Sequence, residues 1–151
     1  MNAANSSTNA GPYVILAALA FDETGEIALH EAALLADQRS DSELHLVHVV
    51  REEAAASSAM ELVTLEKRLA QAPTQIQTYV EKVWASVPRK VIAHVRAGQP
   101  SRSILQTAVD INADIVVVGT HRRAGLKKLM LGSVAQQVLE HAHCPVLIAL
   151  S

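Results

Sequence analysis

Short, nearly continuous apolar runs recur along the chain, separated by longer stretches in which apolar residues return every three or four positions. The short runs predict five β-strands, at residues 13–20, 43–50, 91–95, 115–119 and 146–149. The fourth run is apolar and β-branched up to a closing glycine, which is typical of a strand buried on both faces of a sheet.

Four stretches of helical periodicity lie between these runs. Asp22 or Thr24 offers an N-cap for the first, and Ser101 and Gly132-Ser133 mark the starts of the third and fourth. The second stretch is the longest, and Pro73 interrupts it with a residue that lacks a backbone donor and crowds the preceding turn. A kink or a break is therefore expected near Pro73.

Strands and helices alternate strictly, and right-handed crossovers then make neighbouring strands parallel. The pattern predicts an α/β fold: one doubly wound parallel sheet with helices on both faces. No shift of composition within residues 13–151 marks a linker, so that range is expected to form a single domain. Residues 1–12 are small and polar, and they predict a flexible N-terminal tail rather than a signal peptide.

Composition narrows the class of function. Half of the 151 residues are hydrophobic, which excludes an intrinsically disordered chain, but only 3% are aromatic. Scarce rings argue against single-stranded nucleic acid as a partner, and a net charge of -2 gives no attraction to DNA, RNA or an anionic membrane. The single cysteine, Cys144, and the lack of a bilayer-spanning apolar run favour a cytoplasmic protein.

Candidate chemistry lies in the loops that follow the strands, because doubly wound sheets bind ligands beyond the carboxyl ends of their strands. Gly119 ends one strand and Gly132-Ser133 opens the next helix, and the free N–H groups of a helix start suit a phosphate. The loop between them carries a basic cluster that includes Arg122 and Arg123. An ordinary strand end, helix cap and solvated loop explain the same residues without any ligand.

No catalytic or metal site is expected. The chain has neither a phosphate-binding P-loop nor the G-x-G-x-x-G dinucleotide pattern. Ser133 has no evident histidine and aspartate partners, which disfavours a hydrolase triad. His141, His143 and Cys144 lie close in sequence, but a helix end followed by Pro145 does not aim them at one centre.

Two segments resemble the universal stress protein family, and the resemblance extends over residues 13–150. They are residues 113–121 and 131–148, supported by the Gly98-x-Pro100 turn and by His48-Val49-Val50. The resemblance implies the strand order 3-2-1-4-5 and a cytoplasmic stress-response protein with an unidentified protein partner. It also implies a homodimer that pairs the last strands of two subunits, through Val146, Leu147, Ile148 and Ala149.

One subgroup of this family binds ATP through the motif G-x-x-G-x(9)-G-[ST]. Gly119 and Gly132-Ser133 keep the spacing here, but Arg122 replaces the second glycine. Alignment through Ala28-Leu29 places Ala20 where nucleotide-binding members carry an aspartate that holds the ribose or the adenine edge. The nucleotide site implied by the resemblance comprises Ala18, Ala20, Val49, Val118, Gly119, Thr120, Arg122, Gly132, Ser133 and Val134.

The two replacements weaken the binding that the resemblance implies. Ala20 removes a charge-assisted hydrogen bond worth about 1.5–3 kcal/mol, or roughly ten- to hundredfold in affinity. Arg122 either obstructs the phosphate cradle or adds a bidentate phosphate contact. We therefore expect a non-enzymatic, homodimeric adaptor with weak or absent adenine-nucleotide binding. Two alternatives stay open: a stress sensor that binds ATP or AMP through replacement basic contacts, and a small-anion site at the Ser133 helix start.

Overall fold

The computed structural model describes residues 11–52, 58–83, 90–121 and 131–151. These residues form five strands, β1 (Tyr13–Ala18), β2 (Ser42–Arg51), β3 (Val91–Gly98), β4 (Ile115–Thr120) and β5 (Val146–Leu150). They also form four helices, α1 (Glu23–Asp37), α2 (Ala59–Val83), α3 (Pro100–Asp110) and α4 (Ser133–His141). Most of the predicted N-terminal tail, residues 1–10, lies outside the described residues.

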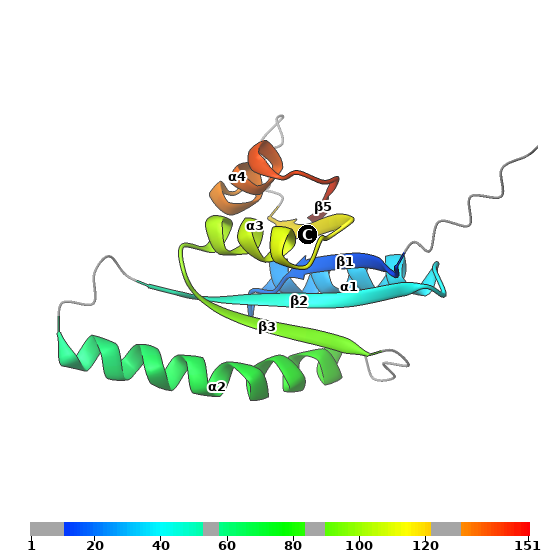
Figure 1. Ribbon diagram of the computed structural model, residues 1–151. Coiled ribbons are helices and arrows are strands. Elements are labelled where there is room, and N and C mark those ends of the chain that lie inside the picture. The colour runs from blue at the N-terminus through cyan, green and yellow to red at the C-terminus, as the bar shows by residue number, and fades with distance from the viewer. Residues whose placement is uncertain (1–10, 53–57, 84–89, 122–130) are drawn as a thin grey trace, which may run out of the picture.

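The strands form one parallel sheet in the order β3-β2-β1-β4-β5 (Figure 1). The predicted doubly wound α/β fold and its strand order are thus confirmed. The direction of winding reverses between β1 and β4, so the loops that follow these two strands diverge at the carboxyl edge of the sheet. Ligands of such sheets bind at that edge, where the predicted site lies.

The two faces of the sheet carry separate halves of the core. Side chains alternate along β1, so Ile15 joins the cluster formed with α1 and α2, while Leu16 joins the cluster formed with α3 and α4. Both side chains are fully buried, as are Leu29 of α1 and Val138 of α4. Figure 1 shows α2 along one face, beside β2 and β3, with α3 and α4 on the other.

The N-cap expected from the sequence is confirmed for α1 but not for α3. Asp22 is the N-cap of α1, as expected: its Oδ1 accepts hydrogen bonds from the Thr24 and Gly25 N–H groups at 2.9 and 3.1 Å. The expectation that Ser101 caps α3 is wrong. The N-cap is Gln99, whose side chain accepts from the Arg102 N–H at 2.9 Å. Pro100 suits the first helical position, because its ring fixes the helical φ, so the helix begins two residues earlier than a Ser101 cap implies.

Of the kink or break expected near Pro73, the break is wrong, because α2 continues through that residue as a single helix. Pro73 lies on the exposed side of the helix, while Ala72, Ile76 and Val80 are buried against the sheet. Packing on both sides of the proline outweighs the single backbone hydrogen bond that it removes. Among the described helices, none is both long enough and apolar enough to cross a membrane.

Candidate functional site

An open cleft lies at the carboxyl edge of the sheet and consists of two adjoining hollows. One, of about 350 Å³, lies against the ends of β1 and β2, and the other, of about 300 Å³, lies against the start of α4. Asp22, Thr24, Gly119 and Val134 line both hollows, so the two are continuous. We call them the β2 half and the α4 half of the cleft.

The α4 half is built around a helix N-terminus. Gly132 is the N-cap of α4, and its N–H donates to Thr120 Oγ1 at 3.0 Å, which fixes the helix start against the end of β4. Ser133 is the first helical residue, so of the pair Gly132-Ser133 that marks this helix start, Gly132 is the N-cap. No hydrogen bond from the described residues reaches the N–H groups of Ser133 or Val134. These donors, at the positive end of the helix dipole, suit an anion.

The β2 half is mainly apolar. Ala18, Val49 and Val118 line it, together with Ala20, which contributes no polar side-chain atom. His48 Nδ1 donates to the Leu19 carbonyl oxygen at 2.9 Å, and the His48 ring lies 4.2 Å from the Phe21 ring, centroid to centroid. A flat apolar group of the size of a nucleobase fits such walls.

Two glycines hold the first turn of α1 close to the sheet. A Cβ atom on Gly119 would lie 1.9 Å from the Thr24 carbonyl oxygen, and one on Gly25 would lie 1.7 Å from the Ala20 carbonyl oxygen. Both neighbours are backbone atoms, so neither can move aside cheaply. The glycine at 119 is therefore required by the packing of α1, whether or not a ligand binds. Gly132 differs, since a Cβ there would meet only Thr120 Oγ1, at 3.6 Å.

Asp22 is an acidic residue that lines both halves of the cleft. Burial alone raises the pKa of its carboxyl, but the hydrogen bonds from Thr24 and Gly25 and the nearby His121 outweigh burial, and the net pKa is lowered. Tyr79 of α2 donates to the Asp22 carbonyl oxygen at 2.7 Å. That contact ties α2 to the loop between β1 and α1, which carries Ala20.

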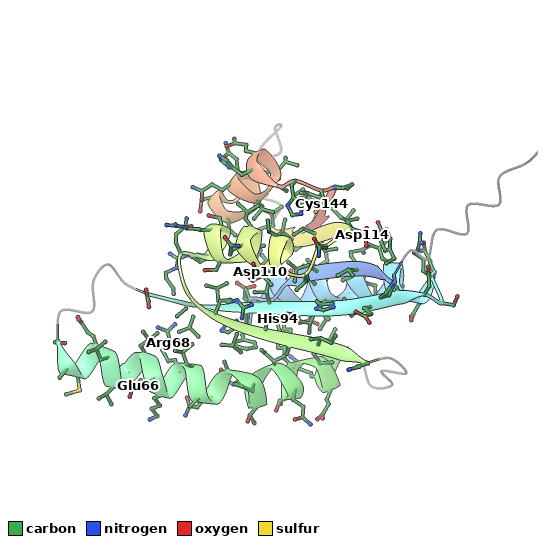
Figure 2. All side chains as sticks on the ribbon, viewed as in Figure 1. Glu66, Arg68, His94, Asp110, Asp114 and Cys144 are labelled. Carbon is green, nitrogen blue, oxygen red and sulfur yellow. The ribbon has the colours of Figure 1, made fainter. Side chains whose placement is uncertain are left out.

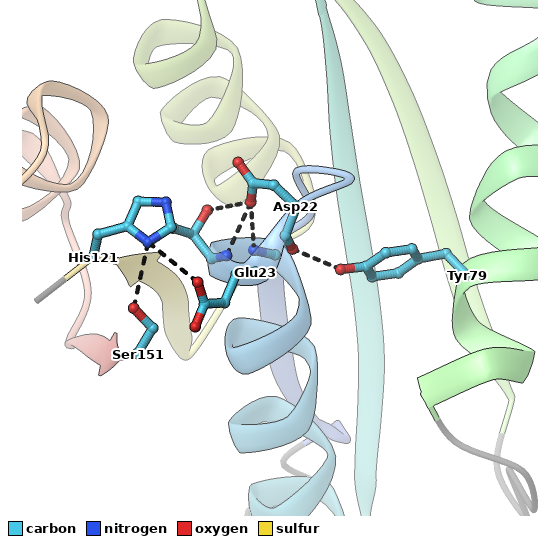
Figure 3. Close-up of polar contacts among 7 residues, drawn as sticks. Asp22, Glu23, Tyr79, His121 and Ser151 are labelled. Atoms are coloured by element: carbon cyan, nitrogen blue, oxygen red, sulfur yellow. Dashed lines mark hydrogen bonds and ion pairs between the residues drawn. The ribbon is translucent and has the colours of Figure 1, made fainter.

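A serine, a histidine and a glutamate meet beside the cleft but do not form a catalytic triad. Ser151 Oγ lies 3.4 Å from His121 Nδ1, and Glu23 Oε2 lies 3.8 Å from the same nitrogen (Figure 3). A triad needs the base to take the nucleophile's proton at one ring nitrogen while the acid holds the other. The described residues also contain no group of three side chains placed to hold a metal ion.

The structure brings nine of the ten predicted site residues together. Ala18, Ala20, Val49 and Val118 line the β2 half, Thr120, Gly132 and Ser133 line the α4 half, and Gly119 and Val134 line both. Arg122 lies outside the described residues.

Several lining residues had no place in the predicted site. Phe21, Asp22 and Thr24 follow Ala20 directly, so their position in sequence was a usable signal. Arg51 is likewise the last residue of β2. Arg68 of α2 also lines the cleft, and nothing in the sequence around it indicates this.

Fold and cleft together define a doubly wound α/β domain that presents a helix N-terminus beside an apolar hollow at its switch point. The model of the universal stress protein family matches residues 14–149. Universal stress protein G of Salmonella typhimurium is 32% identical over 130 residues, covering 83% of this chain and 89% of that protein. The chain belongs to the universal stress protein family.

Two comparisons with Methanocaldococcus jannaschii proteins agree with this assignment. The solved structure of hypothetical protein MJ0577 superposes with a TM-score of 0.76 at 27% identity, covering 94% of this chain and 98% of the other. Universal stress protein MJ0531 is 41% identical over 59 residues, a match that spans 39% of this chain and 35% of that relative.

Proposed function

We propose that this chain is a cytoplasmic stress-response protein that forms homodimers, has no catalytic activity of its own, and binds an adenine nucleotide weakly. A further protein partner is expected to receive its signal. The observation that carries the nucleotide part is the continuity of the cleft, which joins an apolar hollow to the N–H groups of Ser133 and Val134, to which no described residue is hydrogen-bonded. Small-molecule sites commonly combine apolar walls with a few well-placed donors.

Each half of the cleft would hold one part of the nucleotide. The N–H groups of Ser133 and Val134 would receive the 5′-phosphate, assisted by the dipole of α4. Ala18, Val49 and Val118 would pack against the adenine ring. The ribose would lie between them, near Ala20, which has no carboxylate to accept from its hydroxyl groups, while Oδ1 of the neighbouring Asp22 is used to cap α1. That missing contact makes the expected affinity lower by roughly ten- to hundredfold.

Proteins with this fold accommodate adenine nucleotides. A universal stress protein solved in complex with cAMP shares the fold at 17% identity, with a TM-score of 0.63. The universal stress protein from Archaeoglobus fulgidus solved in complex with dAMP shares it at 20% identity, with a TM-score of 0.58. These two structures support the ability of the fold to hold an adenine nucleotide. For this chain, the proposal depends on the residues of its own cleft.

Nucleotide binding is tested by thermal denaturation with AMP or ATP, comparing two substitutions at one position. Ligand at tenfold its Kd stabilises a protein by about 1.4 kcal/mol, a rise of several degrees in Tm. We expect this rise in the wild type and in Gly132→Asn, and its loss in Gly132→Asp. Asparagine and aspartate are both good N-caps, so only the added charge beside the phosphate separates them.

Acid extraction of the freshly purified protein supplies the second measurement. Weak binding predicts that little or no nucleotide remains after purification. Stoichiometric adenine nucleotide in the extract would contradict weak binding and favour the ATP- or AMP-sensor alternative. No Tm rise with any adenine nucleotide at 10 mM, a concentration about tenfold above a millimolar Kd, would contradict nucleotide binding altogether.

The homodimer part of the proposal rests on β5, which lies at one edge of the sheet. Its outer side presents unpaired backbone groups, and Val146, Leu147 and Ile148 are partly exposed, while Ala149 is buried. Pairing with a second copy would satisfy that edge.

Ile148→Asp should release monomers on size-exclusion chromatography. The matched variant Ala93→Asp, on the β3 edge, should leave the dimer intact. A folded Ile148→Asp variant with wild-type elution would contradict this interface.

A further inference from the structure

Two arginines line the β2 half of the cleft, at the side formed by the end of β2 and by α2. Arg51 is the last residue of β2, and Arg68 comes from the middle of α2 (Figure 2). Both side chains are exposed, and within the described residues neither makes a hydrogen bond or an ion pair. Two positive charges therefore face the same hollow as Ala20, and no side chain of the described residues pairs with either of them.

Among the described residues, two of the carboxylates near these arginines lie outside the hollow that contains Ala20. Glu52 and Glu61 line an adjoining groove, on which Arg51 and Arg68 also border, but they do not line the cleft. Asp22 does line it, and Oδ1 of Asp22 is engaged in capping α1. The charge on this side of the hollow is thus predominantly positive, which favours an anionic group on the ligand.

The chemistry at this side differs from that of a site built for an unmodified ribose. A carboxylate recognises ribose hydroxyl groups by accepting their hydrogen bonds, whereas an arginine accommodates a phosphate attached to the ribose. Position 20 carries no carboxylate, and the arginines provide planar donors that match phosphate oxygens. Ala20 therefore weakens the binding of a nucleotide with an unmodified ribose. It also leaves room, beside two guanidinium groups, for a nucleotide that carries a further phosphate on the ribose.

We propose that Arg51 and Arg68 form a second phosphate subsite, and that the cleft prefers an adenine nucleotide that carries a phosphate on its ribose in addition to the 5′-phosphate. This inference rests on the proposed function, which places the 5′-phosphate at the start of α4. The cleft then has two anion-binding ends, one made of backbone N–H groups and one made of arginine side chains.

Isothermal titration calorimetry with three ligands tests the subsite: AMP, adenosine 3′,5′-bisphosphate and adenosine 2′,5′-bisphosphate. At least one bisphosphate should bind about tenfold more tightly than AMP, as expected for one added charge-assisted contact. The isomer that gains affinity identifies the ribose position that the arginines reach. Arg68→Gln and Arg51→Gln should each reduce the ratio of the bisphosphate affinity to the AMP affinity.

Lys67→Gln is the matched control. Lys67 precedes Arg68 in α2 and is also exposed, but it does not line the cleft, so its removal should leave the bisphosphate advantage intact. Equal affinities for AMP and both bisphosphates would overturn the inference and leave the proposed function standing. So would an advantage that persists in the double variant Arg51→Gln/Arg68→Gln. If none of the three ligands binds, both the proposed function and this inference are wrong.

Discussion

The two ends of the cleft present hydrogen-bond donors and positive charge by different means. At the α4 end the donors are backbone N–H groups of Ser133 and Val134, held by the hydrogen bond between Gly132 and Thr120. At the other end the donors are the side chains of Arg51 and Arg68, which project from separate elements. A backbone site persists as long as the fold does, whereas a side-chain site changes with single substitutions. Under the two proposals, the α4 end would therefore set the class of ligand, and the arginine end would set the choice within that class.

The largest effect is expected from the two glycines of the α4 end, whose roles differ. Gly119→Ala places a Cβ 1.9 Å from the Thr24 carbonyl oxygen and must displace α1, at a cost of about 3 kcal/mol. Gly132→Ala meets only an ordinary contact and weakens an N-cap, which costs less than about 1 kcal/mol. Urea unfolding followed by circular dichroism, at fixed protein concentration, measures both.

The pair of variants separates a glycine needed for folding from one needed for the ligand. If Gly119→Ala loses less than about 0.5 kcal/mol, the close approach of α1 to β4 is not rigid and Gly119 has no special structural role. If Gly132→Ala loses as much as Gly119→Ala, the start of α4 is part of the folding core rather than an adaptable binding edge.

A feature could be predicted from the sequence when it follows from a local pattern, and not when it depends on packing between distant segments. The sheet and nine residues that meet in one cleft could be predicted, because they follow from local patterns. These patterns are the apolar runs, their order and the spacing from Gly119 to Gly132-Ser133. Arg68 could not be found in this way, because α2 reaches the cleft only through its packing along the sheet. The start of α3 was misplaced by two residues, since the side chain of Gln99 caps the helix in place of the shorter Ser101.

A smaller effect is expected at Asp22, which borders both halves of the cleft. Asp22→Ala removes the N-cap of α1 and should cost about 1 kcal/mol at neutral pH, whereas Asp22→Asn keeps an acceptor and should cost less. Because the folded pKa of Asp22 lies below its unfolded value, its stabilisation is present above about pH 4 and is lost as the pH falls through the folded pKa.

Urea unfolding between pH 2 and pH 7 checks this dependence. Asp22→Asn should show a shallower loss of stability below pH 4 than the wild type. Identical acid profiles for the two proteins would mean that the hydrogen bonds from Thr24 and Gly25 do not favour the ionised carboxylate.

The smallest effect on stability is expected at His45 and His94, a histidine pair that does not line the cleft and can be compared with it. Burial lowers the pKa of His94. The charges of His45, whose Nδ1 lies 2.9 Å from His94 Nε2, and of Arg96 lower the pKa further, whereas Asp110 opposes them. A folded pKa below the unfolded value of about 6.5 means that stability is complete above that pH and is lost as the pH falls below it. The loss should be under about 1 kcal/mol, since His94 is only partly buried.

His94→Gln should flatten the stability profile between pH 7 and pH 5. His30→Gln, on the exposed face of α1, provides the matched control and should keep the wild-type profile. A wild-type profile in His94→Gln would assign that pH dependence to another group. The ligand affinity of the cleft should be unchanged in both variants, because neither histidine lines it.

The central claim is that the start of α4 receives the phosphate of an adenine nucleotide whose base lies against the ends of β1 and β2. Titration of the ¹⁵N-labelled protein with AMP, followed by amide chemical shifts, tests this directly. We predict the largest shifts at the amides of Ser133 and Val134, smaller ones at Ala18, Val49 and Val118, and none at the Ser133 amide in Gly132→Asp. Saturating AMP that leaves the amides of Ser133 and Val134 unmoved, or shifts only residues outside the cleft, would contradict the claim.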